Sequence, residues 1–244
     1  MNRPVQLALV AVVITVLVAT GIFVLTAPAP RDREVLYQIG SLDGLMAGQF
    51  AGKGSVAELL AHGDIGLGTY DGLDGEMIVI DGRCYQALAD GTVNVAVNNE
   101  TTPFAQVSRF DVDGTVGLHG VVNLSQVEAL IEGSLPSNGT FYVLRIDGTF
   151  DNITVRSVPR QVLPYPTLSD VLAEQTVFQY QNLAGTMVGI WSPSDAAGLS
   201  SAGFHFHFIS DDRTRGGHVL DLDLSDLTAQ WDGTAHYDVE LGTV

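Results

Sequence analysis

The glycines of this chain recur at the short intervals that separate β-strands, and this spacing constrains the fold more than any other feature. The 244 residues include 27 glycines, placed among runs rich in Val, Ile, Phe and Tyr. Such runs favour strands, whereas glycine favours the tight turns that join them. The pattern therefore predicts an α+β protein that is predominantly β, with only a few short helices.

Strands and helices are predicted from these runs and from capping residues. We expect helices over 55–61, over 125–131 with Ser125 as N-cap, and over 167–174. Three prolines between Pro159 and Pro166 predict a boundary between two sheet-centred units, a mixed-sheet unit over 31–160 and a β unit over 161–244. The expected strands cover 76–80, 93–97, 107–110, 141–146, 153–158, 185–191, 203–210, 218–224 and 236–241.

The first thirty residues form a separate segment. No residue between Val5 and Ala27 is charged, and at about 1.5 Å per residue such a helix can cross a hydrocarbon core about 30 Å thick. The run is longer than the apolar part of a typical signal peptide. We therefore predict a membrane anchor or a signal peptide over 1–30, and an extracytoplasmic protein that is membrane-anchored or secreted.

Charge and cysteine content exclude several functions. The formal net charge is −17, and this field disfavours binding to nucleic acid, which is itself a polyanion. High acid content with one lysine is compatible with a salt-rich habitat. The single cysteine, Cys84, excludes an intrachain disulfide and a cysteine-based metal site within one chain. A homodimer through an exposed sheet edge is compatible with this composition.

Three histidines predict a metal site. Side chains alternate along a strand, so His205 and His207 should share one face, while the intervening phenylalanines point into a core. If the following turn is centred between Asp212 and Arg213, His218 lies directly opposite His207 on the returning strand. Three neutral imidazoles suit zinc and leave a coordination position open.

This spacing names neither the metal nor the reaction. A cupin-like site also begins with His-x-His, but there a glutamate usually follows, whereas Asp211 and Asp212 stand in the predicted turn here. A different zinc or iron enzyme, such as a hydrolase or dioxygenase, and a non-catalytic zinc-binding protein anchored at the membrane are both compatible with the histidines.

Three longer motifs resemble those of the α-acetolactate decarboxylase family. The first runs Gly-Asp64-Ile-Gly-Leu-Gly-Thr69-Tyr-Asp-Gly-Leu-Asp-Gly-Glu76-Met-Ile. The second is Phe-Tyr-Val-Leu-Arg145-Ile-Asp-Gly-Thr-Phe, followed by Arg156-Ser-Val-Pro. The third is Phe-His205-Phe-His207-Phe-Ile-Ser-Asp-Asp-Arg-Thr-Arg-Gly-Gly-His218. The resemblance extends over about 36–241, with the motifs in the family's order.

The resemblance implies a role for each matched residue. It implies that His205, His207 and His218 bind Zn²⁺. It further implies that Glu76 and Arg156 are catalytic, and that Thr69 and Arg145 contact substrate. Family members also use a glutamate on a C-terminal tail that folds back over the site. The nearest glutamate here is Glu240, which we expect within a strand rather than at that position.

The reaction implied by the resemblance is the decarboxylation of acetolactate to acetoin and carbon dioxide, which leads pyruvate-derived carbon toward butanediol. Loss of carbon dioxide leaves an enediolate, whose negative charge a zinc ion stabilises as a Lewis acid. Glu76 or Arg156 could deliver or relay the proton that the enediolate takes up. Arg156 could instead hold the departing carboxylate as a bidentate partner, and the sequence leaves these roles open.

Overall fold

The computed structural model describes residues 34–242. The anchor or signal peptide predicted over 1–30 lies outside the described residues. None of the helices within residues 34–242 is long and apolar enough to cross a membrane. The predominantly β architecture with a few short helices is confirmed.

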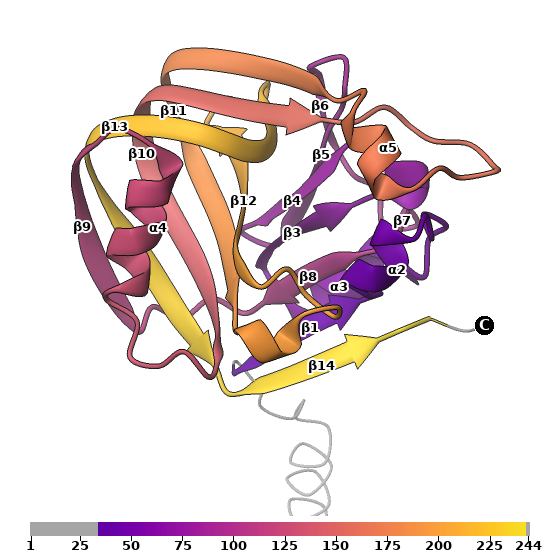
Figure 1. The fold of residues 1–244 in the computed structure, drawn as a ribbon, viewed down its shortest axis with the longest axis horizontal. Coiled ribbons are helices and arrows are strands. Elements are labelled where there is room, and N and C mark those ends of the chain that lie inside the picture. Colours follow the sequence, from indigo (N-terminus) through magenta and orange to yellow (C-terminus); the bar gives the residue numbers. More distant parts are fainter. Residues whose placement is uncertain (1–33, 243–244) are drawn as a thin grey trace, which may run out of the picture. The chain divides into compact units, whose positions relative to one another are not determined.

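The first sheet has seven strands in the order β14-β1-β8-β3-β4-β5-β6, and β1 and β14 are its one parallel pair (Figure 1). A separate two-stranded pair joins β2 (Gly54–Ser55) to β7 (Thr101–Thr102). The strands of the first sheet are β1 (Val35–Ile39), β3 (Ile65–Thr69), β4 (Glu76–Ile80), β5 (Arg83–Ala87), β6 (Val93–Val95), β8 (Ala105–Ser108) and β14 (His236–Glu240).

The second sheet has five longer strands in the order β10-β11-β12-β13-β9. Because β10 also pairs with β13, four of these strands close on themselves around a core that contains Phe150, Phe206 and Phe208. The strands of this sheet are β9 (Gly114–Val121), β10 (Phe141–Ser157), β11 (Thr176–Ser192), β12 (Gly203–Ser210) and β13 (Gly216–Thr234).

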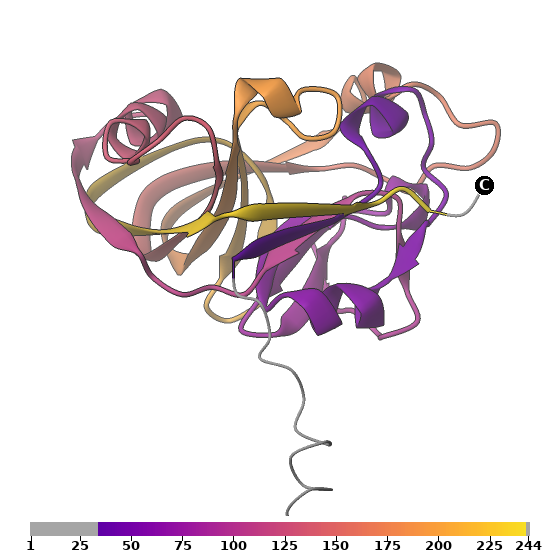
Figure 2. The ribbon, with the colours of Figure 1, turned by 90° about the horizontal axis from the view of Figure 1, so that it is seen from below.

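Both faces of the first sheet are covered. Met77 and Val79 of β4 point toward α3 (Val56–His62), whereas Ile78 of the same strand packs with Val188 and Ile209 of the second sheet. Figure 2 shows α3 below the first sheet and the curled second sheet beside it. Side chains of β4 with even numbers, Glu76 among them, therefore point toward the strands that carry the histidines.

The short helices begin at polar capping residues. Ser55 and Glu58 form a capping box at the start of α3, and Thr167 and Asp170 form one at α5 (Leu168–Leu172). The predicted N-cap at Ser125 is wrong: the N-cap of α4 (Leu124–Glu132) lies two residues earlier, at Asn123, whose side chain accepts a hydrogen bond from the Gln126 amide. The remaining helices within the described part of the chain are α2 (Leu42–Met46) and two one-turn 3₁₀ helices, Asp71–Leu73 and Ser194–Ala196.

The chain order of the strands differs from the division predicted at residue 160. Strands β9 and β10 precede this position but belong to the second sheet, whereas β14 follows it and belongs to the first. The strands predicted at 141–146 and 153–158 are one strand, β10, because Gly148 stays within the ladder opposite Gly185. A cut at residue 160 therefore does not separate the two sheets.

Candidate metal centre

The histidines lie on a hairpin with the predicted register. Strands β12 and β13 are antiparallel, and His207 lies directly opposite His218. Asp212 builds the turn between them, because its Oδ1 accepts hydrogen bonds from the Ser210 hydroxyl at 2.7 Å and the Thr214 hydroxyl at 2.7 Å. Asp212 is thus engaged in the turn, and the histidines point together toward the first sheet.

Three ring nitrogens of these histidines converge. His205 Nε2 lies 3.1 Å from His207 Nε2 and 3.1 Å from His218 Nδ1, and the latter two nitrogens are 3.3 Å apart. A tetrahedral zinc ion bound at about 2.0–2.1 Å holds its nitrogen ligands about 3.3–3.4 Å apart. The three nitrogens therefore fit three corners of a tetrahedral metal site.

The three rings are neutral at ordinary pH. Burial, with a smaller effect from the nearby charge of Arg156, lowers the pKa of His205 to about 3. Burial likewise holds the pKa values of His207 and His218 well below the usual range, with smaller effects from the neighbouring rings and Arg156. His207 Nδ1 lies 2.8 Å from the carbonyl oxygen of Met77. A proton on this nitrogen donates to the carbonyl and leaves Nε2 free as a metal ligand.

A buried ion pair borders the histidines. Arg156 Nη1 donates to Glu76 Oε1 at 2.7 Å, and the two side chains are only 14% and 7% exposed. Glu76 Oε2 lies 3.5 Å from His207 Nε2. Burial raises the pKa of Glu76, and the charge of Arg156 partly opposes this rise. The strand pairing explains why Arg156 lies beside the histidines, because Arg156 of β10 pairs directly with His218 of β13.

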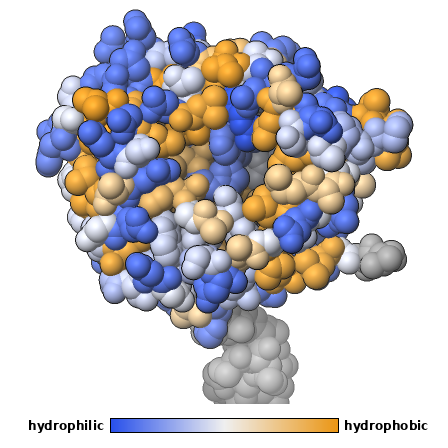
Figure 3. All heavy atoms as spheres, in the orientation of Figure 1, coloured by the Kyte–Doolittle hydropathy of each residue, from blue (hydrophilic) through white to orange (hydrophobic). Residues whose placement is uncertain are grey.

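These groups open into a cavity of about 250 Å³. Figure 3 shows a hollow in the surface between the two sheets, bordered by both hydrophilic and hydrophobic residues. Its polar side chains are Thr69, Glu76, Arg156, Ser201, His205 and His218. Its apolar wall includes Leu42, Leu45, Leu73, Phe104, Val158 and Leu168. A volume slightly below that of drug-sized pockets suits a small metabolite.

The structure brings Thr69 to this site but not Arg145. Thr69 lines the cavity next to its ladder partner Glu76, and its hydroxyl donates to the carbonyl of Gly75 at 2.8 Å. Arg145 is absent from the cavity wall and donates instead to Asp81 at 2.8 Å and Asp147 at 2.7 Å. The prediction that Arg145 contacts substrate therefore has no support from its position, which is that of a structural ion pair.

Several lining residues carry no motif in the sequence. The apolar wall comes from α2, from α5 and from loops far apart along the chain, and ordinary hydrophobic residues there resemble core residues. Ser201 follows the 3₁₀ turn Ser194–Ala196 and was also missed. Only the fold brings these residues together. The one sequence signal is the spacing of Leu42 and Leu45, which is typical of one buried face of a short helix.

Comparison with known proteins identifies the family. The family model for α-acetolactate decarboxylase matches residues 36–243. The chain is 42% identical over 208 residues to the α-acetolactate decarboxylase of Methanosarcina mazei, an alignment that covers 85% of this chain and 72% of the relative. It is 42% identical over 196 residues to that of Klebsiella aerogenes, covering 80% of this chain and 75% of the relative.

A solved structure agrees with the sequence comparison. The crystal structure of α-acetolactate decarboxylase from Bacillus subtilis superimposes with a TM-score of 0.83 at 33% sequence identity, covering 86% of this chain and 90% of the other. The chain therefore belongs to the α-acetolactate decarboxylase family.

Proposed function

We propose that this protein decarboxylates acetolactate to acetoin and carbon dioxide, with a zinc ion held by His205, His207 and His218. The observation that carries the proposal is the convergence of three imidazole ring nitrogens, 3.1–3.3 Å apart, beside a cavity bordered by a buried arginine–glutamate pair. Membership of the family supports the substrate. The set of three imidazoles without a cysteine supports zinc.

The bound ion would supply Lewis-acid stabilisation of the negative charge that develops on the ketone oxygen. Arg156 binds the substrate carboxylate. Its Nη1 group already donates to Glu76, and its other N–H groups have no hydrogen-bond partner among the described residues. Because a guanidinium remains charged in proteins, it can orient the carboxylate but is a poor proton donor. We therefore propose that Arg156 orients the carbon–carbon bond that joins the carboxylate to the rest of the substrate and that breaks in the reaction.

Glu76 supplies the proton in this proposal. Burial raises its pKa, so the protonated carboxyl is more populated at a given pH than it would be in water, and a protonated carboxyl can act as a general acid. Arg156 fixes the carboxyl through Oε1, while Oε2 faces His207. Protonation of the enediolate from this one side would give a single acetoin enantiomer.

The test is acetoin formation from racemic acetolactate by the full-length protein. Chelator-treated protein should be inactive and should regain activity with stoichiometric zinc, as measured by acetoin assay together with metal analysis. The His205→Ala variant should lose both zinc and activity, whereas His119→Ala, which removes a surface histidine paired with Asp226, should keep both. Folded, zinc-loaded protein that forms no acetoin above the spontaneous rate would sink the proposal and favour a non-catalytic zinc-binding role.

We also propose an extracytoplasmic location and a homodimeric assembly. We infer an extracytoplasmic position, membrane-anchored or secreted, from the uncharged run between Val5 and Ala27, and the homodimer is inferred only from exposed sheet edges. Cell fractionation checks the first inference, and sedimentation of the purified protein checks the second. Recovery in the cytosolic fraction, or a monomer at all concentrations, would contradict them.

A further inference from the structure

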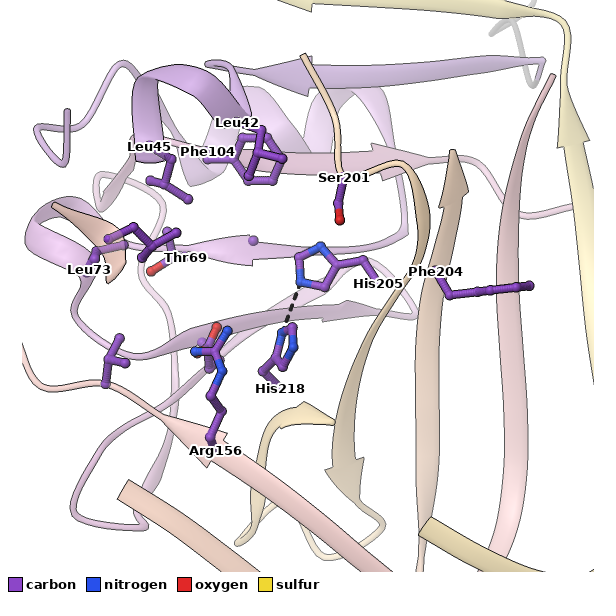
Figure 4. Close-up of a pocket in the computed structure, with 14 residues that line it drawn as sticks. Leu42, Leu45, Thr69, Leu73, Phe104, Arg156, Ser201, Phe204, His205 and His218 are labelled. Carbon is purple, nitrogen blue, oxygen red and sulfur yellow. Dashed lines mark hydrogen bonds and ion pairs between the residues drawn. The ribbon is translucent and has the colours of Figure 1, made fainter. Parts of the chain in front are cut away.

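The cavity wall contains two hydroxyl groups, and they differ in their hydrogen bonding. Thr69 commits its proton to the carbonyl of Gly75 at 2.8 Å. Ser201 lines the same cavity, but its hydroxyl makes no hydrogen bond to any residue within the described range 34–242. Figure 4 shows the Ser201 oxygen directed toward His205, with Arg156 entering from the other side. Ser201 thus presents a free donor and acceptor to whatever fills the cavity.

The residue before Ser201 is held by a buried polar network. Ser200 is 1% exposed, and its hydroxyl shares a hydrogen bond of 2.7 Å with the Ser192 hydroxyl. Gln106 Nε2 donates to the Ser200 oxygen at 2.9 Å and to Gln38 Oε1 at 2.8 Å. The loop over 193–202 is therefore tied to β8 and β1 of the first sheet directly beside Ser201.

Further contacts complete this attachment. Gln38 Nε2 donates to the carbonyl of Leu199 at 2.9 Å, and the Tyr237 hydroxyl donates to Gln38 Oε1 at 2.6 Å. The network is incompletely satisfied, because Gln106 Oε1 is buried without a partner among the described residues. Such a network stabilises a fold less than apolar packing does. What it supplies here is a fixed position for two consecutive loop residues.

We propose that Ser201 is a further substrate-contacting residue, whose hydroxyl donates a hydrogen bond to a substrate oxygen on the side of the cavity opposite Arg156. The inference rests on the proposed function, in which the substrate carries carboxylate, hydroxyl and ketone oxygens. Arg156 pairs with the carboxylate, so a second donor across the cavity restricts rotation of the substrate. A donor whose backbone is held in place before binding loses less entropy when the hydrogen bond forms.

The experiment compares Ser201→Ala with a matched control, Ser194→Ala. Ser194 lies on the same loop but is exposed and does not line the cavity. Ser201→Ala should lower kcat/KM for acetolactate about tenfold or more, the usual effect of losing a hydrogen bond to a charged or strongly polar group. Its zinc content and melting temperature should equal those of the wild type, and Ser194→Ala should match the wild type in all three measurements.

A binding measurement separates this inference from the proposed function. α-Hydroxyisobutyrate carries the carboxylate, hydroxyl and methyl groups of acetolactate on one carbon but lacks the ketone, so it cannot lose carbon dioxide by the same route. Calorimetric titration into the zinc-loaded protein should give a Kd about tenfold higher for Ser201→Ala than for Ser194→Ala. Wild-type protein that binds this probe but forms no acetoin would refute the function alone. A Ser201→Ala variant with wild-type Kd and kcat/KM would overturn the role of Ser201.

Discussion

Removal of one partner of the Arg156–Glu76 pair should destabilise the metal-free protein strongly at alkaline pH. Both side chains are nearly inaccessible, at 14% and 7% exposure, and the nitrogen–oxygen distance is 2.7 Å. In Arg156→Met the carboxylate of Glu76 stays buried without its cation. Breaking a buried ion pair in this way costs about 3–5 kcal/mol. For a protein of this size, about 2–4 °C of melting temperature corresponds to each kcal/mol, so we expect a decrease of roughly 6–20 °C.

The sign of the pH dependence follows from the pKa of Glu76. Burial raises this pKa in the folded state, and loss of Arg156 removes the opposing effect. A carboxyl with a raised folded pKa contributes stability at low pH that is lost as pH rises from about 4.3, its unfolded value, through the folded pKa. The difference in melting temperature between wild type and Arg156→Met should therefore be smaller at pH 5 than at pH 8.

The assay is thermal unfolding followed by circular dichroism, in chelator, at both pH values. A double variant, Arg156→Met with Glu76→Gln, supplies the control, because it removes the buried charge and should recover part of the lost stability at pH 8. A loss of the same size at both pH values would refute the reasoning. So would a double variant that melts below Arg156→Met at pH 8.

Three further predictions concern residues outside this pair. Burial, with neighbouring carboxylates, raises the pKa of Asp232 to about 7. Asp232→Asn should therefore raise the melting temperature at pH 8, where it removes a destabilising charge, but not at pH 4. Equal shifts at the two pH values would contradict this. Gln106→Leu should lower kcat/KM in the wild-type background but have little further effect in Ser201→Ala, since it acts through Ser201; additive losses would argue for a separate structural effect. Arg145→Gln should leave kcat/KM within about twofold and cost at most about 1 kcal/mol of stability, as expected for a partly exposed ion pair; a tenfold loss of activity would restore its predicted contact with substrate.

The metal hairpin could be predicted because its geometry is local. Alternation along one strand puts His205 and His207 on one face, and a short polar turn sets His218 opposite His207. The site residues Glu76 and Arg156 are a different case, since nothing in local patterning brings them to the hairpin. They were predicted from the family resemblance, and the structure joins them through an ion pair that depends on the packing of one sheet against the other.

Arg145 illustrates why a motif alone could not assign each residue. It lies on the same strand as Arg156, eleven positions earlier, and a strand advances about 3.3 Å per residue. Arg156 consequently reaches Glu76 at the beginning of β4, whereas Arg145 reaches Asp81 just beyond the end of β4. Because two separate strands were predicted, the distance between Arg145 and Arg156 along one strand could not be inferred. The apolar wall and Ser201 could not be predicted for the related reason that loops distant in sequence assemble them.

The parallel pairing of β1 with β14 has a consequence for the order in which the protein can form. Val35 pairs with His236 and Ile39 with Glu240, so nearly the whole described chain lies between the partners. During synthesis the hairpin of β12 and β13 can close as soon as it leaves the ribosome, because its contacts are near in sequence. The edge of the first sheet can be completed only after β14 has been synthesised. Until then β1 offers an uncovered row of backbone donors and acceptors, and a nascent chain in this state is exposed to pairing with the wrong neighbour.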